Sequence, residues 1–171
     1  MQTLEWRFVD KSSWPCGAWQ NEPDKKQWLD EETGYPCLIH RAPMGALCGY
    51  VGVSKAHPLY GIGYENFWFD ESHSNVDIDV HGGLTYSDFG MDTAESGRGI
   101  GHLTEDEDKI WWFGFDCAHL HDFIPGLLGG RVCYGESSYK PLAYVETHVK
   151  SLAKQLKELE KYEDNFDKTS G

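Results

Sequence analysis

The chain has 171 residues and a formal net charge of −13, from 28 acidic and 15 basic side chains. This balance disfavours binding to nucleic acid or to an anionic membrane, because both require clustered lysine and arginine. The length and the 40% hydrophobic content suit one domain that folds without disulfides or a metal. Because no apolar run reaches about 18 residues, we expect no membrane-spanning helix.

The cysteines form an odd set without a CxxC pair, and the first residues lack the charged and then apolar pattern of a signal segment. Reduced thiols in a cytoplasm fit this usage best, so we predict a cytoplasmic protein. The five cysteines are Cys16, Cys37, Cys48, Cys117 and Cys133.

The first third of the chain reads as strands separated by loops. Residues 4–8 alternate between apolar and charged side chains, which predicts a half-buried strand. A polar loop follows over 11–24, and we expect a short helix over 24–30. Two apolar runs, 35–40 and 46–53, are separated by a segment with proline and glycine, which predicts a β-hairpin.

The rest of the chain adds two strands and one long helix. We predict strands over 76–81 and 110–116, a short extended piece over 84–87, and a long exposed loop over 88–108. Apolar residues recur at helical spacing from Val145 to Leu159, after Pro141. We therefore predict an α+β fold in which a single antiparallel or mixed sheet is covered by a long C-terminal helix. Residues 1–162 would form the domain and 163–171 a frayed polar tail.

A polar cluster follows the predicted strand 76–81. A period of two places Asp77, Asp79 and His81 on one face, with neighbouring side chains about 6–7 Å apart. Two glycines then allow a sharp turn or the close approach of a ligand. Thr85 and Tyr86 supply hydroxyl groups just beyond that turn.

A second polar cluster follows the apolar strand 110–116. Asp116 and His119 would meet on one face if the chain turns helically there. A carboxylate beside an imidazole orients the ring and raises its pKa, an arrangement used in general acid–base catalysis. We therefore predict a shared site in which His81, Asp116 and His119 are catalytic. The two clusters share it only if their strands end at the same edge of the sheet.

Other residue types extend this site. Thr85 and Tyr86 would hydrogen-bond a ligand, and Trp111 or Trp112 would offer a stacking surface. A divalent metal is an open alternative, with Asp77, Asp79, His81 and His119 as candidate ligands. Arg98, within a glycine-rich stretch, is a candidate phosphate donor without the strand–loop–helix context of a phosphate loop.

Plain structural roles stay open for the same residues. Asp77 and Asp79 would also suit the solvated face of an edge strand. Asp116 would also suit a cap of the following turn, because aspartate often accepts hydrogen bonds from backbone N–H groups two or three residues on. Cys117 is a poor nucleophile candidate, because the neighbouring carboxylate raises the pKa of a thiol.

Several strings resemble a family of small uncharacterised proteins of bacteriophages and bacteria. The most specific are the VHGGLTY and GFDCAH motifs, and the similarity spans most of residues 14–155. The resemblance implies a phage or bacterial cytoplasm as the setting, and counter-defence against the host as a context. It implies no mechanism. The strings lie at Gly34–Ile39, Leu47–Val53, Val80–Tyr86 and Gly114–His119.

Two hypotheses follow. In the first, the chain is a small-molecule site protein that binds or hydrolyses a nucleotide-like ligand, and it would be a hydrolase if it is an enzyme. In the second, it is an acidic interaction protein that mimics nucleic acid and blocks a basic host protein. Neither requires direct binding of nucleic acid or of a membrane.

Overall fold

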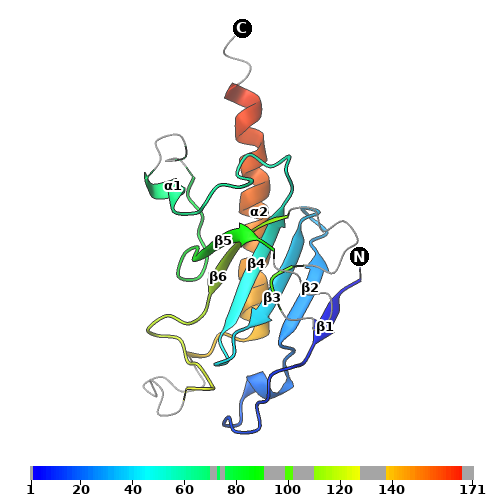
Figure 1. Cartoon of the computed structure of the whole chain (residues 1–171), viewed down its shortest axis with the longest axis vertical. Helices are drawn as coiled ribbons and strands as arrows, with labels where there is room; N and C mark the ends of the chain where they lie inside the picture. The colour runs from blue at the N-terminus through cyan, green and yellow to red at the C-terminus, as the bar shows by residue number, and fades with distance from the viewer. Residues whose placement is uncertain are drawn as a thin grey trace.

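The computed structural model describes residues 2–69, 73, 76–90, 99–101, 110–127 and 138–166 of the chain. Within these residues six strands form one antiparallel sheet in the order β1-β2-β3-β4-β6-β5 (Figure 1). The strands are β1 (Leu4–Trp6), β2 (Lys25–Leu29), β3 (Pro36–Arg41), β4 (Leu47–Val53), β5 (Tyr86–Phe89) and β6 (Trp111–Asp116). The described helices are the 3-10 helix η1 (Ala18–Asn21), the short α1 (Asn66–Phe69) and the long α2 (Leu142–Phe166).

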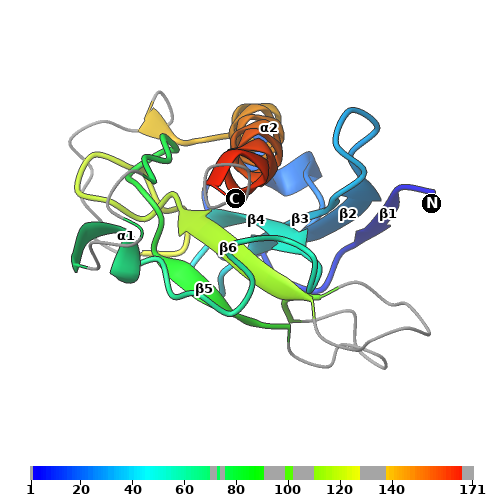
Figure 2. The same cartoon turned by 90° about the horizontal axis from the view of Figure 1, so that it is seen from above.

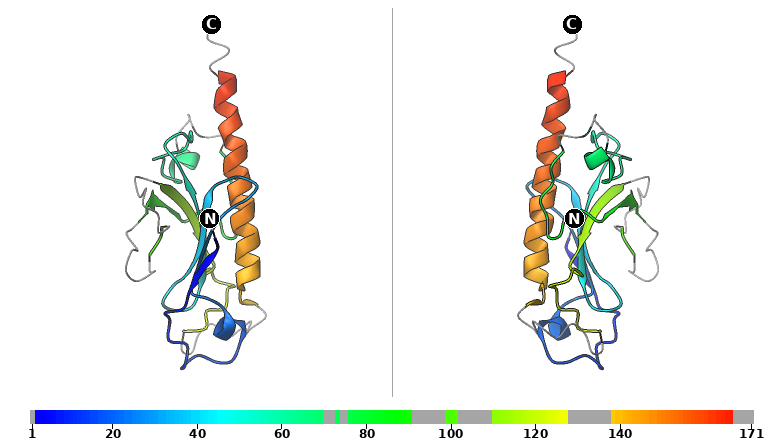
Figure 3. Two further views of the ribbon diagram at one scale, coloured as in Figure 1. Left: turned by 90° about the vertical axis from the view of Figure 1, so that its right-hand side faces the viewer. Right: turned by 90° about the vertical axis from the view of Figure 1, so that its left-hand side faces the viewer.

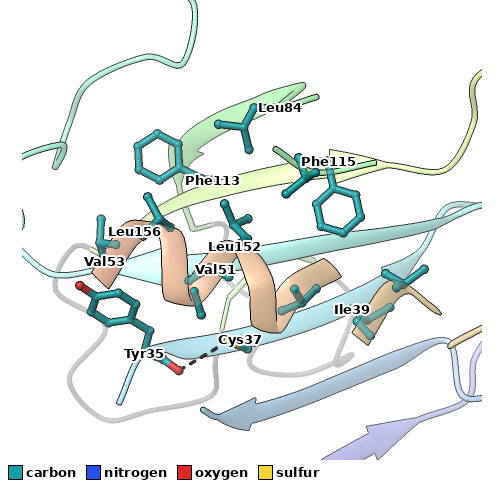
Figure 4. Close-up of a cluster of buried hydrophobic side chains, with 14 of the residues drawn as sticks. Tyr35, Cys37, Ile39, Val51, Val53, Leu84, Phe113, Phe115, Leu152 and Leu156 are labelled. Carbon is teal, nitrogen blue, oxygen red and sulfur yellow. Dashed lines mark hydrogen bonds between the residues drawn. The ribbon is translucent and has the colours of Figure 1, made fainter. Parts of the chain in front are cut away.

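Helix α2 covers one face of the sheet, which confirms the predicted α+β architecture (Figures 2 and 3). The apolar positions of its predicted stripe are fully buried at Val145, Val149, Leu152 and Leu156. Figure 4 shows Leu152 and Leu156 packed among side chains of β4 and β6. The core therefore lies between α2 and the sheet, while the opposite face of the sheet carries a smaller apolar cluster.

The predicted hairpin and three further predicted extended segments agree with the structure. β3 and β4 form the predicted hairpin, with Arg41 opposite Leu47 at its turn. β1 and β6 lie within the predicted runs 4–8 and 110–116, and β5 overlaps the expected extended piece at 84–87. The end of the helix is different, because α2 continues to Phe166, beyond the predicted limit at 162. Most of the predicted loop 88–108 lies outside the described residues.

The predicted helix at 24–30 is wrong, because residues 25–29 form strand β2 between β1 and β3. The sequence of β2 lacks an apolar alternation, since Lys25 and Gln27 occupy its buried positions on the face away from α2. Backbone pairing to two neighbouring strands outweighs the local preference of a polar segment for helix.

The predicted strand at 76–81 is also wrong, because this segment pairs with no strand of the described sheet. It lies beside α2 (Figure 3), and its backbone is held by a side chain of the helix. Asp79 N–H donates to Gln155 Oε1 at 2.8 Å, and Gln155 Nε2 donates to the Asp79 carbonyl at 2.8 Å. The predicted facing still holds, since Val80 is buried while Asp77 and Asp79 are exposed.

A buried ionic network joins the start of β2 to the start of α2. The fully buried Arg41 guanidinium donates to Asp24 Oδ1 at 2.9 Å and to Tyr139 Oη at 2.8 Å. Glu22 Oε1 accepts from the same tyrosine hydroxyl, and Glu22 Oε2 accepts from Leu142 N–H at the first turn of α2. A carboxylate at that position also interacts favourably with the helix dipole.

None of the described helices is long and apolar enough to cross a membrane.

Truncation of Leu152 to alanine should remove part of the contact between α2 and the sheet. The side chain is fully buried, so we expect Leu152→Ala to lower the free energy of unfolding by about 2–5 kcal/mol. Leu120, whose side chain is 63% exposed, provides the control, and Leu120→Ala should change it by less than about 0.5 kcal/mol. Urea unfolding followed by circular dichroism measures both; equal losses would contradict the assigned core.

Candidate functional site

His81 is hydrogen-bonded at both nitrogens of its ring. His81 Nε2 lies 2.8 Å from Asp122 Oδ2, and Nδ1 lies 2.9 Å from Tyr144 Oη. An ionised carboxylate can only accept, so Nε2 donates to Asp122, and in the tautomer protonated at Nε2 the Nδ1 atom accepts a hydrogen bond from the Tyr144 hydroxyl. The result is a continuous chain of hydrogen bonds from a carboxylate through an imidazole to a hydroxyl.

Asp122 is the buried anchor of this chain, with 6% of the residue exposed. Its Oδ2 atom accepts from both His81 Nε2 and the backbone N–H of His119, the latter at 3.0 Å. Its Oδ1 atom lies 3.6 Å from Lys140 Nζ. Two hydrogen bonds and one ion pair therefore surround this carboxylate, as the burial of an acidic group requires.

Helix α2 supplies two aromatic side chains to the cluster, one turn apart. The rings of Tyr144 and His148 lie 4.6 Å apart between centroids, and His148 Nδ1 accepts the backbone N–H of His81 at 3.2 Å. Burial raises the pKa of Tyr144, and Cys117 and Asp122 add to this effect, so the hydroxyl keeps its proton at neutral pH. Burial and the neighbouring His81 lower the pKa of His148, so this ring is neutral there.

His119 lies directly beside His81, with 5.6 Å between the ring centroids. The two meet because Gly82 follows His81 in a turn at a φ of 69°, and a side chain there would collide with His119 Nε2. That nitrogen is buried and has no hydrogen-bond partner within the described part of the chain, although Asp116 Oδ1 lies 3.6 Å away. Gly82 is therefore required both for the turn and for the approach of the two histidines.

Asp116 caps the turn that follows β6, which is one of the two roles predicted for it. Its Oδ1 accepts the backbone N–H of Ala118 at 3.0 Å, two residues on, and its Oδ2 accepts the Thr85 hydroxyl at 2.8 Å. It also faces His119, so the structure brings together four predicted site residues: His81, Thr85, Asp116 and His119. The carboxylate that hydrogen-bonds to His81 is nevertheless Asp122.

Three predicted ligand contacts do not reach this cluster. Trp111 is buried in the main core and donates its indole N–H to the Ile62 carbonyl at 3.1 Å, which leaves no free stacking face. Trp112 is buried on the opposite face of the sheet, with 1% exposed. Tyr86 packs against Tyr50 on that same opposite face. The alternation along a strand explains why these side chains cannot all face one site.

The predicted metal ligands are not assembled either. Asp77 and Asp79 are exposed on the segment before His81, and their carboxylates do not join the rings of His81 and His119 in a ligand set. Over the described part of the chain, no three His, Cys, Asp or Glu side chains are grouped to hold a metal ion. Arg98, the predicted phosphate donor, lies outside the described residues.

One surface hollow formed by described residues has a volume of about 730 Å³ and lies elsewhere, between β2 and the first half of α2. Its lining includes Lys26, Trp28 and Glu146 and none of the residues of the histidine cluster. The candidate site is therefore defined by its hydrogen bonds and not by this hollow.

Cys117 is buried beside the cluster. Burial raises the pKa of its thiol, and the nearby Asp122 carboxylate adds to the effect, so the thiolate is not available near neutral pH. This agrees with the expectation that Cys117 is a poor nucleophile.

Sequence reasoning missed Asp122, Lys140, Tyr144 and His148. Tyr144 and His148 stand four residues apart on the predicted helix, a spacing that places two side chains on one face, so this pair could have been found. Asp122 follows His119 by three residues, which is also a turn spacing. The link from either pair to His81 depends on the packing of 76–81 against α2.

No protein family matches the chain, and no curated protein or solved structure is similar to it. The family resemblance carried by the VHGGLTY and GFDCAH strings therefore stays a prediction.

Two neighbouring glycines allow the contact between Gly82 and His119 to be tested. Both have a positive φ, of 69° at Gly82 and 80° at Gly83, but an added Cβ meets His119 only at Gly82. Gly83→Ala should cost about 1–2 kcal/mol of unfolding free energy, from backbone strain alone. Gly82→Ala should cost more and should also shift the NMR resonances of the His119 imidazole. Identical losses, with unchanged His119 resonances in both variants, would show that the close approach is absent.

Proposed function

We propose that the chain is a small-molecule site protein that binds or hydrolyses a nucleotide-like ligand at the cluster around His81. The observation that carries this proposal is the hydrogen-bonded chain from the buried Asp122 through His81 to Tyr144. A buried carboxylate that fixes the tautomer and orientation of an imidazole is an arrangement that acid–base sites use.

The proposed ligand meets the cluster at the Tyr144 hydroxyl. As a base, neutral His81 takes the Tyr144 proton at Nδ1 while the tyrosine oxygen takes a proton from an attacking water. As an acid, protonated His81 returns a proton to Tyr144, which passes its own proton to the leaving oxygen. In a protein that only binds, the same hydroxyl donates a hydrogen bond to the ligand. This role centres on His81, whereas Asp116 and His119 become flanking groups.

A nucleotide-like ligand is supported by the local groups and not by the global charge. Lys140 and the neighbouring imidazoles are donors that can face a phosphate, and at contact distance a few donors outweigh a net charge that is screened beyond about 10 Å. The ring pair of Tyr144 and His148 offers aromatic surface on which a base can stack.

The setting we propose is a cytoplasm, that of a bacterial host if the chain is phage-encoded. No disulfide joins any two of the four described cysteines, which suits a reducing compartment. In that setting the resemblance to phage proteins extends the proposal to counter-defence, in which the protein sequesters or degrades a nucleotide signal.

Thermal unfolding with a panel of nucleotides tests the site. We expect at least one nucleotide to raise the melting temperature of the wild type, and Asp122→Asn to abolish most of that rise, because the amide disturbs the tautomer of His81. Asp88→Asn, the same change at an exposed position on β5, should leave the rise intact. Tyr144→Phe should retain part of the binding and lose at least tenfold in any hydrolysis rate.

The results also separate binding from catalysis. A nucleotide that raises the melting temperature but yields no hydrolysis product indicates a sequestering protein. Chromatography of the incubated nucleotide detects the product. No rise with any nucleotide, or an equal rise in Asp122→Asn, would contradict the proposal.

The alternative function, an acidic protein that mimics nucleic acid, is favoured by the net charge of −13. Such a protein should capture a basic partner whose binding weakens steeply as salt increases. That binding should be unchanged in Asp122→Asn, which removes no surface charge from the mimic because Asp122 is buried.

A further inference from the structure

A second set of polar side chains lies on the face of the sheet away from α2. Trp6, Lys25 and His40 are directly paired across β1, β2 and β3, so their side chains share one face. Gln27 follows Lys25 by two residues and joins the same face opposite Leu38, whose cluster lies there. Figure 2 shows this face on the side of the sheet opposite to α2.

Lys25 is fully buried, yet it has little to balance its charge. Its Nζ atom donates to the Gly101 carbonyl at 2.9 Å and lies 5.1 Å from the centre of the Trp6 ring. No carboxylate among the described residues is within ion-pair distance of it. Burial lowers the pKa of Lys25 to about 8, so most of these side chains still carry a proton at pH 7. A buried ammonium without a counter-charge is costly.

Gln27 is also fully buried, and neither Nε2 nor Oε1 of its amide has a hydrogen-bond partner among the residues that the structure describes. Leaving a buried polar group unpaired destabilises the folded protein. Lys25 and Gln27 are two residues apart on β2, so the ammonium and the amide lie on the same buried face of the sheet. His40 beside them is held neutral, since burial lowers its pKa to about 4.

We propose that this face holds a small oxyanion, a carboxylate or a phosphate group, bound by Lys25 Nζ and Gln27 Nε2. The oxyanion replaces the Gly101 carbonyl as the acceptor at Lys25, because a charged acceptor forms the stronger hydrogen bond. His40 and Trp6 border the site on the neighbouring strands. The site is separate from the His81 cluster, which lies beside α2 on the other face.

The test compares phosphate, acetate and adenosine monophosphate with sodium chloride at equal ionic strength. At about a hundred times its dissociation constant, a bound oxyanion should raise the melting temperature by about 5 °C or more. If only one of the three compounds raises the melting temperature, that compound identifies the group that is bound. Lys25→Met and Gln27→Leu should each abolish the rise, and the matched change on the opposite face, Lys26→Met, should retain it.

Gln27→Leu has a second readout that needs no ligand. Removing an unpaired amide should keep or raise the melting temperature of the ligand-free protein, whereas removing a paired one should lower it. If Lys25→Met does not fold, the side-chain amide signal of Gln27 in NMR replaces it and should shift on addition of the oxyanion. Asp122→Asn should retain the rise that phosphate or acetate produces, which separates this site from the nucleotide site of the proposed function. A rise that persists in Gln27→Leu, or no rise with any of the three compounds, would overturn the site.

Discussion

The packing of α2 is the constraint on which the rest of the described structure depends. One side of the helix buries Val149 and Leu152 against the sheet, and an adjacent side holds the segment before His81 through Gln155. Tyr144 and His148 then face His81 from the same helix. Residues more than 60 positions apart meet because one rigid helix contacts both the sheet and this segment. The geometry of the His81 cluster is therefore no more stable than the docking of α2.

The buried charges of the molecule differ in how completely they are balanced. Arg41 is enclosed by Asp24, Glu22, Tyr139 and two backbone carbonyls, so every part of its guanidinium has an acceptor. These hydrogen bonds link β2, β3 and the start of α2, so the buried guanidinium has a structural role. Lys25 is equally buried but has a single described hydrogen bond. This contrast within one protein is why the lysine, and not the arginine, points to a missing partner.

Much of the fold could be predicted because apolar periodicity records which faces are buried. The stripe of α2 and the runs of β3, β4 and β6 are of this kind. β2 could not be recognised, since Lys25 and Gln27 occupy its buried positions on the face away from α2, and only pairing with two neighbours makes it a strand. In the segment 76–81 the alternation of apolar and acidic residues predicts which side chains are buried. The hydrogen-bond partner of its backbone, however, is Gln155 of α2, which no local pattern indicates.

The candidate site was half predictable for the same reason. The predicted pair of Asp116 and His119 follows from spacing within one turn, and it exists, although the carboxylate mainly caps that turn. His81 draws its carboxylate from Asp122, a residue just as close in sequence to His119 as Asp116 is. The two carboxylates differ in burial: Asp122 is enclosed with two hydrogen-bond donors and the Lys140 ammonium, whereas Asp116 keeps 30% of its side chain exposed. Local spacing can propose a carboxylate for a histidine, but the low dielectric of the interior selects the one that orients it.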